Sequence, residues 1–241
     1  MKPTDDLLGK PLALVVALAL VSLLPFLFMS LTAFVKISTV LQIVRSALGV
    51  QSVPSNTVIM ALSAVLALLA MAPVGSEIAN RASPLLSAKN AETSTMVREG
   101  YRAVADPLRG FLKANASEEE RGRFFDIAKR ARERKTQNDI DAEKNGDKSK
   151  VEFGVIPPAA PDDFTVLAPA FMVTELTEAF SIGFLIYLPF LVIDLVVANV
   201  LLALGMQMLS PTQVSLPFKL LLFVAINGWS LLAEALVASY R

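Results

Sequence analysis

Five ionisable residues lie within otherwise apolar stretches of the last third of the sequence: Glu175, Glu178, Asp194, Lys219 and Glu234. An ionisable side chain in a hydrophobic helix is costly unless it is paired or lines a polar path, so each is a candidate site residue. Two chemistries fit this pattern. One is a pathway for ions or protons, and the other is pairing between helices or between subunits.

Glu175 and Glu178 are three residues apart, which places both carboxylates on one side of a helix. Such a pair could act as a proton relay or contribute to a metal site. The sequence contains no histidine and no cysteine, so the commonest general base and the usual nitrogen and sulfur metal ligands are absent. We therefore favour pairing at helix interfaces, and expect no metal, no cofactor and no enzymatic activity. The net charge of zero gives no basic surface for nucleic acid.

Four long apolar segments must position these side chains. They run from 11 to 35, from 57 to 74, from about 164 to 209 and from 216 to 238. The first has no charge over its whole length, which is enough to span about 30 Å of hydrocarbon. We interpret it as a retained helix and not as a cleaved signal peptide, because it is longer than a typical signal core.

The charged residues are concentrated between the second and third segments. Residues 76–164 hold 16 of the 22 Lys and Arg residues and 16 of the 22 Asp and Glu residues. The sequence therefore predicts an all-α membrane protein. Two long, kinked helical hairpins, residues 1–75 and 165–241, are joined by a soluble, mainly helical insertion, residues 76–164. The flanking charges leave the orientation in the membrane open.

Helical spacing of apolar residues continues past the first segment, so we expect one helix from 11 to about 47, kinked at Pro25. In the insertion, Ser117 and Glu120 form a capping-box pattern that predicts a helix from 118 to 134. A further helix is expected around 91–113. The polar stretch 136–150 reads as a loop, and 151–163 reads as an extended linker.

The third segment is too long for a simple crossing, and Gly183 and Pro189 are its expected break or kink points. The fourth helix is expected from about Phe218, with Pro217 in its first turn. Counting residues from the connecting turn places Asp194 and Asn227 at one depth, where they could share a hydrogen bond.

The same count places Lys219 close to the turn. Lys219 is thus expected to be too far from Asp194 to pair with it, and to find its partner in solvent, in another element or in another subunit.

Three stretches together resemble the FliP/SctR family, whose members are core subunits of type III secretion export gates. They are PAFMVTELTEAFSIGFLIYLPFLVIDLVVANVLLALGM (169–206), SLPFKLLLFVAINGW (215–229), and TAFVKISTVLQIVRSALGVQSVP (32–54) followed by MAPVG (71–75). The IGFLIYLPF run and the RGFLK stretch at 109–113 are more similar to the injectisome branch, SctR, than to flagellar FliP.

The resemblance implies a pentamer that assembles with FliQ/SctS-type and FliR/SctT-type subunits, beside FlhB/SctU-type and FlhA/SctV-type export components. It implies a location in the bacterial inner membrane, with the insertion on the periplasmic side. The implied function is part of the channel for unfolded protein substrates. A small-solute or ion transporter that uses the intramembrane carboxylates is the alternative, although the two hairpins show no visible repeat.

The resemblance also implies a gate constriction at Met206, Gln207 and Met208. Methionine is apolar and flexible, so a ring of such side chains could close around varied polypeptides. The alternative is that both methionines fill packing gaps. Gly228 is expected to allow close approach of the helix that carries Trp229, and Trp229 could instead be an interfacial anchor.

Overall fold

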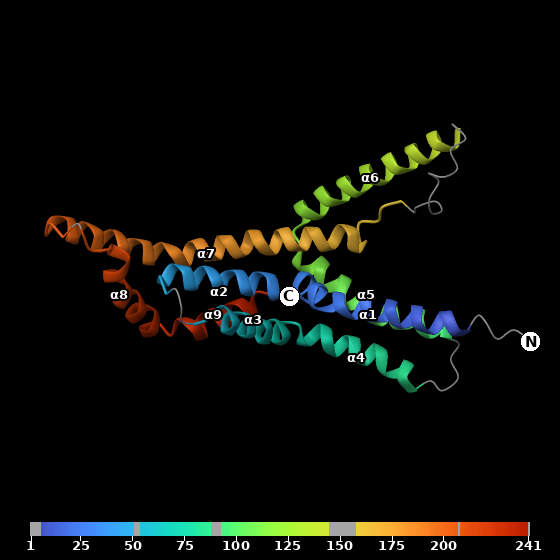
Figure 1. Ribbon diagram of the computed structural model, residues 1–241, viewed down its shortest axis with the longest axis horizontal. Coiled ribbons are helices and arrows are strands. Elements are labelled where there is room, and N and C mark those ends of the chain that lie inside the picture. Colours follow the sequence, from blue (N-terminus) through green and yellow to red (C-terminus); the bar gives the residue numbers. More distant parts are fainter. Residues whose placement is uncertain (1–5, 51–53, 88–92, 145–157, 207, 241) are drawn as a thin grey trace, which may run out of the picture.

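The computed structural model describes residues 6–50, 54–87, 93–144, 158–206 and 208–240, and within these ranges every regular element is a helix (Figure 1). The helices are α1 Asp6–Leu31, α2 Phe34–Leu48, α3 Asn56–Ala70, α4 Ala72–Ser87, α5 Thr93–Asn115, α6 Glu118–Lys144, α7 Phe164–Ala203, α8 Pro211–Ala225 and α9 Gly228–Ala238. The predicted all-α class is confirmed. Among the described residues, one helix, α7, is long and apolar enough to cross a membrane, and up to four spans result if each bent pair of helices counts as one.

The longest element, α7, has 40 residues, and at 1.5 Å per residue it is about 60 Å long. It runs through Gly183 and Pro189 without interruption, so the expected break at these residues is wrong. Gly183 instead allows close packing on α2. A Cβ atom at this position would lie 2.5 Å from Cδ1 of Ile43.

The first segment breaks at a different place from the one predicted. α1 continues through Pro25, and the chain bends by 66° between Leu31 and Phe34. At this bend the Thr32 hydroxyl donates to the Phe28 carbonyl at 2.6 Å and accepts the Phe34 N–H at 3.3 Å. The side chain therefore replaces backbone hydrogen bonds that a straight helix would make, which a search for prolines does not detect.

The fourth segment ends at Ala238 as expected but differs from its prediction at its start and in having a bend. α8 begins with Pro211. Pro217, which was expected in the first turn, lies inside the helix. α8 and α9 are bent by 59° at Asn227, whose φ of 53° is left-handed. Asparagine tolerates this conformation better than most residues, so it permits a sharp change of direction without a glycine.

In the insertion, the predicted helix around 91–113 is confirmed by α5, and the predicted cap is present because the Ser117 hydroxyl accepts the Glu120 N–H at 3.2 Å. α6 continues to Lys144, so the first part of the predicted loop 136–150 is helical. The rest of that loop and the linker residues 151–157 lie outside the described residues. α4 crosses the boundary expected at residue 75.

The main core surrounds α2, which lies between α7 and the pair α3 and α9 (Figure 1). The residues whose spacing predicted this helix, Ile37, Val40, Leu41, Val44 and Leu48, are all buried. A second cluster, centred on Phe111 and Phe171, attaches α5 to the N-terminal half of α7. The molecule is elongated, with the α7–α8 connection at one tip and α1, α4 and α6 extending toward the other.

Candidate functional site

One buried ionic cluster joins α2 to α7, and we name it the Lys36 cluster. The Lys36 ammonium lies 2.7 Å from Glu178 Oε2 and 3.2 Å from Glu175 Oε1. Lys36 and Glu175 are almost completely buried, whereas the Glu178 side chain is 51% exposed. The two glutamates that suggested a relay therefore share one cation from the first hairpin.

Tyr240, two residues beyond α9, completes this cluster. Its hydroxyl donates to Glu175 and also lies 3.1 Å from the Ala33 carbonyl oxygen. Its ring stacks on Phe111 of α5 at 5.9 Å and carries the Lys36 ammonium 4.3 Å above its centre. Tyr240 therefore contacts both hairpins and the insertion at one point.

A second ionic cluster lies near the tip and involves Asp194 of α7. Lys219 of α8 donates to Asp194 Oδ2 at 2.6 Å and to the Ala47 carbonyl at 3.1 Å. The Ser215 hydroxyl lies within hydrogen-bonding distance of the other Asp194 oxygen. The prediction that Lys219 cannot reach Asp194 is therefore wrong. Lys219 and Ser215 are both buried.

The error has a simple geometric cause. The count along the helices began at Leu209, but α7 ends at Ala203 and a loop occupies the positions up to Ser210. Asp194 is nine residues before Ala203 and Lys219 is eight after Pro211, so both lie about 12–14 Å from the helix ends. They are therefore level, and the flexible lysine side chain closes the remaining gap.

Because α7 ends six residues earlier than the count assumed, at Ala203 and not at Leu209, Asn227 is not level with Asp194. The hydrogen-bond partners of Asp194 are Lys219 and Ser215 instead. The Asn227 side-chain oxygen accepts the Ser230 hydroxyl at 3.2 Å. The next residue, Gly228, is buried against the preceding helix: a Cβ atom there would lie 2.3 Å from the ring of Phe223. Trp229 packs edge-on against the same ring at 5.2 Å.

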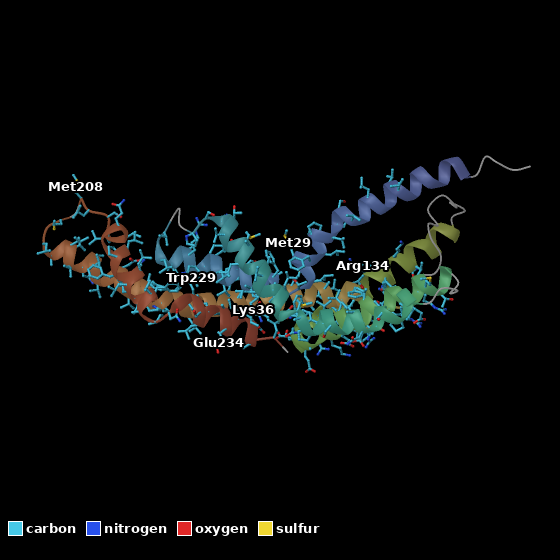
Figure 2. The ribbon with its side chains drawn as sticks, turned by 90° about the horizontal axis from the view of Figure 1, so that it is seen from below. Met29, Lys36, Arg134, Met208, Trp229 and Glu234 are labelled. Atoms are coloured by element: carbon cyan, nitrogen blue, oxygen red, sulfur yellow. The ribbon has the colours of Figure 1, made fainter. Side chains whose placement is uncertain are left out.

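The loop between α7 and α8 forms the tip of the molecule, where Met208 projects away from the helices (Figure 2). Met208 is fully exposed and Met206 is 45% exposed. Gly205 has a φ of 73°, which turns the chain out of α7, and the Met206 N–H bonds back to the Leu201 carbonyl at 2.9 Å. Gln207 lies outside the described residues.

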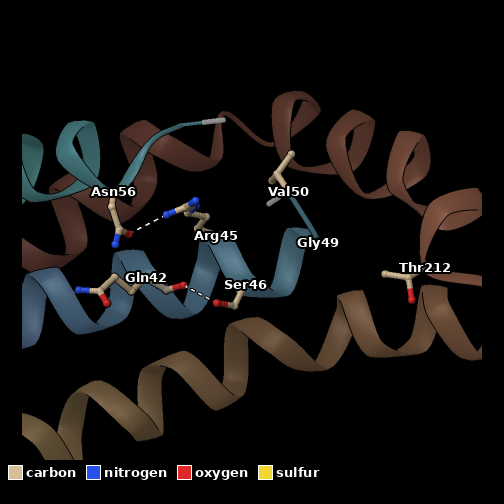
Figure 3. Close-up of a pocket in the computed structure, with 7 residues that line it drawn as sticks. All are labelled: Gln42, Arg45, Ser46, Gly49, Val50, Asn56 and Thr212. Carbon is tan, nitrogen blue, oxygen red and sulfur yellow. Dashed lines mark hydrogen bonds between the residues drawn. The ribbon is translucent and has the colours of Figure 1, made fainter. Parts of the chain in front are cut away.

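A polar cavity of about 390 Å³ lies at the turn of the first hairpin (Figure 3). Arg45 closes one side and donates to Asn56 at 2.7 Å, which ties the end of α2 to the start of α3. Gly49, with a φ of 77°, ends α2, and Thr212 of α8 reaches the same cavity. The cavity therefore lies where the turn of the first hairpin meets the start of α8.

The remaining candidate, Glu234, is exposed on α9 (Figure 2). Across the described ranges, no three acidic side chains are close enough to hold a metal ion.

Lys36, Ser215 and Tyr240 were missed by the sequence reasoning. Lys36 follows directly after the first apolar segment, 11–35, and is 2% exposed. The sequence signal for Lys36 was a single cation beside a row of apolar residues at helical spacing. Nothing in the sequence indicated a role for Tyr240.

The matches to known proteins extend over both hairpins and the insertion. The FliP family model matches residues 17–236. The hypersensitivity response secretion protein HrcR of Ralstonia nicotianae is 41% identical over 234 residues, which cover 95% of this chain and 97% of that protein. The Yop proteins translocation protein R of Yersinia pestis is 40% identical over 228 residues, with 94% and 95% coverage.

A flagellar relative matches equally well in identity but not in extent. The flagellar biosynthetic protein FliP of Cereibacter sphaeroides is 41% identical over 232 residues, which cover 95% of this chain but 66% of that protein. The near-complete match to the first two proteins therefore supports the injectisome branch. The chain belongs to the FliP family and is similar to its injectisome members.

Proposed function

We propose that this protein is a core subunit of a type III secretion export gate, where it forms part of the channel for unfolded protein substrates. The observation that carries this proposal is the match to secretion and translocation proteins over nearly their whole length. The proposed role is that of a channel component and not of an enzyme. Its proposed location is the bacterial inner membrane, which it enters with several helices.

The exposed apolar surface near the tip supports assembly with other subunits. α7 is about twice as long as the hydrocarbon core of a bilayer is thick, so part of it needs another apolar surface. Large apolar side chains are exposed on α7 and α8 toward the tip: Phe184, Leu185, Val192, Leu195, Val196, Val200, Phe218, Leu221 and Val224. We propose a ring of five copies with FliQ/SctS-type and FliR/SctT-type subunits, beside FlhB/SctU-type and FlhA/SctV-type components.

The tip loop is the proposed constriction. In a ring, the fully exposed Met208 and the half-exposed Met206 of each copy would face the channel together with Gln207. Methionine side chains can adapt to a passing chain and close after it. An amide among them would hold water, so Gln207 is the proposed weak point of this seal.

The transporter alternative is weakened by the ionic clusters. Glu175 and Glu178 pair with Lys36, and Asp194 pairs with Lys219, within a single chain. Carboxylates that are neutralised by fixed cations in the helix interfaces do not form an open path for ions. The Lys36 pairs instead join the first hairpin to the second, and the Asp194–Lys219 pair joins the two arms of the second hairpin.

Assembly tests the proposed function. The full chain should be co-expressed with the genes that neighbour it and purified in mild detergent, and its mass measured by native mass spectrometry. We expect a ring of several copies together with smaller membrane subunits. A protein that never exceeds a dimer under these conditions would contradict the gate function and favour a transporter.

A further inference from the structure

An apolar groove of about 610 Å³ lies where α1, α5 and α7 diverge. Its walls are mostly hydrocarbon and aromatic side chains, chiefly Phe26 and Leu31 of α1, Tyr101 and Val104 of α5, and Phe164 and Met172 of α7. The hydroxyl of Ser30, which also lines it, donates to the Phe26 carbonyl within α1. The groove therefore offers a binding surface to an apolar molecule.

The α1 side of this groove continues into a stretch of helix, residues 21–27, that its own chain leaves uncovered on every face. All seven residues from Val21 to Leu27 are exposed, and Leu14 and Leu18 are 70% and 72% exposed. A helix that is hydrophobic all round and stands free of its own chain requires an apolar surrounding medium. Figure 2 shows α1 leaning away from the helices of the insertion.

The α5 side continues the groove as a stripe along the helix. Val97, Tyr101 and Val104 are 68%, 57% and 46% exposed, and their spacing of four and three residues places them on one face. Leu108, four residues further, lines the groove itself. The medium that surrounds α1 can therefore reach the α5 stripe through the groove without crossing a polar barrier.

Basic residues flank the stripe. Arg98 and Arg102 each follow a stripe residue, which puts them about 100° around the helix from it. Both are well exposed, and both lie near the Glu99 carboxylate, at 3.7 Å for Arg98 and 3.3 Å for Arg102. α5 carries four basic and two acidic side chains: Arg98, Arg102, Arg109, Lys113, Glu99 and Asp106. An amphipathic helix with an excess of basic residues beside its apolar face suits the surface of an anionic bilayer.

The rim of the groove also carries side chains that suit the boundary between hydrocarbon and water. The Arg109 guanidinium lies 4.9 Å from the centre of the Phe164 ring and donates to the Tyr101 hydroxyl at 3.4 Å. This holds the tyrosine with its ring toward the groove and its hydroxyl toward polar groups. Tyrosine in this arrangement is typical of the boundary between hydrocarbon and water.

We propose that this groove and the α5 stripe bind anionic phospholipid, with acyl chains between α1 and α5 and phosphates at Arg98 and Arg102. The insertion then contacts the membrane surface in addition to the helices that enter it. The proposal rests on the exposed surfaces of α1 and α5 and does not depend on the gate function. A second copy of the chain or another subunit in the groove is the competing occupant.

Lipid quenching of a site-specific fluorophore tests the proposal, and the absence of native cysteine makes single labelling direct. The full chain carrying Val97→Cys or Val104→Cys is labelled and reconstituted into vesicles of phosphatidylcholine and phosphatidylglycerol with brominated acyl chains. Leu18→Cys on α1 is the positive control. Gly110→Cys is the matched negative control, because it is exposed on the opposite side of α5 and faces open space.

We expect the brominated lipid to remove about half of the emission at positions 97, 104 and 18, and little at position 110. Equal quenching at 97, 104 and 110 would overturn the proposal, as would an unquenched label at position 18. Replacing Arg98 and Arg102 with Gln should reduce quenching at 97 but not at 18, and no reduction would refute the phosphate contact. A thiol crosslink from position 97 to another chain in place of quenching would assign the groove to a protein partner. Failure of ring assembly would leave these results unchanged, so the two proposals fail separately.

Discussion

At the scale of single residues, two lysines that lie near opposite ends of α2 have similar roles. Lys36 of α2 is held by glutamates of α7, and Lys219 of α8 is held by Asp194 of α7 and by the Ala47 carbonyl near the end of α2. A cation beside the last carbonyls of a helix is favourable because it complements the negative end of the helix dipole. Both lysines thus fix the first hairpin to the second.

The Asp194–Lys219 pair predicts an asymmetric response to mutation. Lys219 is 3% exposed, so Asp194→Leu leaves a buried cation with one carbonyl partner and should cost about 3 kcal/mol. Lys219→Met should cost less, because Asp194 is 25% exposed and keeps the Ser215 hydroxyl beside it. The measurement is the thermal unfolding midpoint of each variant in the same detergent.

The double variant Asp194→Leu with Lys219→Met is the control for this comparison. It removes both charges, so much of the loss caused by Asp194→Leu alone should be recovered. If the two single losses simply add in the double variant, the pair does not stabilise the folded chain. Lys219 would then act at a subunit interface, which is one of the three kinds of partner that the sequence left open.

Tyr240 separates the contribution of a hydroxyl from that of a ring. Tyr240→Phe keeps the stacking on Phe111 and removes the hydrogen bonds to Glu175 and Ala33, so it should cost roughly 1–3 kcal/mol. Tyr240→Ala also leaves a cavity between the hairpins and the insertion, and should cost roughly 3–5 kcal/mol. Thermal unfolding measures both, and equal losses would show that the ring contributes nothing.

At the scale of elements, the existence of the helices was predictable and the positions of their bends were not. The apolar period of residues 37–48 predicted α2, and the Ser117 cap predicted the start of α6. The bends at Thr32 and Asn227 depend on one hydroxyl bond and one left-handed residue. Neither residue type is specific enough in sequence to indicate a bend, whereas the prolines that are more conspicuous lie in continuous helices.

The same limit explains the mistaken partner of Lys219. The hydrophobic pattern continues from α7 into the tip loop, so the sequence alone does not show that the helix ends at Ala203. An error of about six residues shifts the register by roughly 9 Å along the axis. Contacts within the hairpin depend on this register, whereas the apolar character of each helix does not.

The bend between α8 and α9 provides a test at this scale. Gly228→Ala would place its Cβ atom 2.3 Å from the Phe223 ring. The ring cannot move freely, because it is buried and packs against Phe190 and Trp229. We therefore expect a loss of about 1–3 kcal/mol, measured by thermal unfolding, from crowding at the bend.

Two variants control this prediction. Adding Phe223→Leu to Gly228→Ala should recover part of the loss, because the smaller side chain makes room for the methyl group. Gly110→Ala lies on an exposed helix surface with open space, so it should be neutral or stabilise α5 by up to about 1 kcal/mol. Similar losses at both glycines would mean that close packing at the bend is unimportant.

At the scale of the whole molecule, the shape separates a clamped region from an exposed tip. The Lys36 cluster and the main core lie near the middle of α7, and the methionine loop lies at its end (Figure 2). The exposed apolar surface of α7 and α8 lies between them. Side chains at the tip make few contacts within one chain, so substitutions there should leave the fold intact and affect what the assembled ring does.

The proposed constriction can therefore be tested without disturbing assembly. Replacing Met206 and Met208 with Ala in the co-expressed complex should increase the leak of small solutes across resting membranes several-fold. Five copies would each lose two flexible apolar side chains from the seal. Met29→Ala is a matched control, since Met29 is 43% exposed against 45% for Met206 but lies on α1, away from the tip. Its leak should equal that of the unaltered complex.

Gln207→Met should act in the opposite direction from the alanine variants, because it replaces an amide that holds water with a third thioether. An intact ring with an unchanged leak in the Met206→Ala, Met208→Ala variant would refute the seal while leaving the gate function standing.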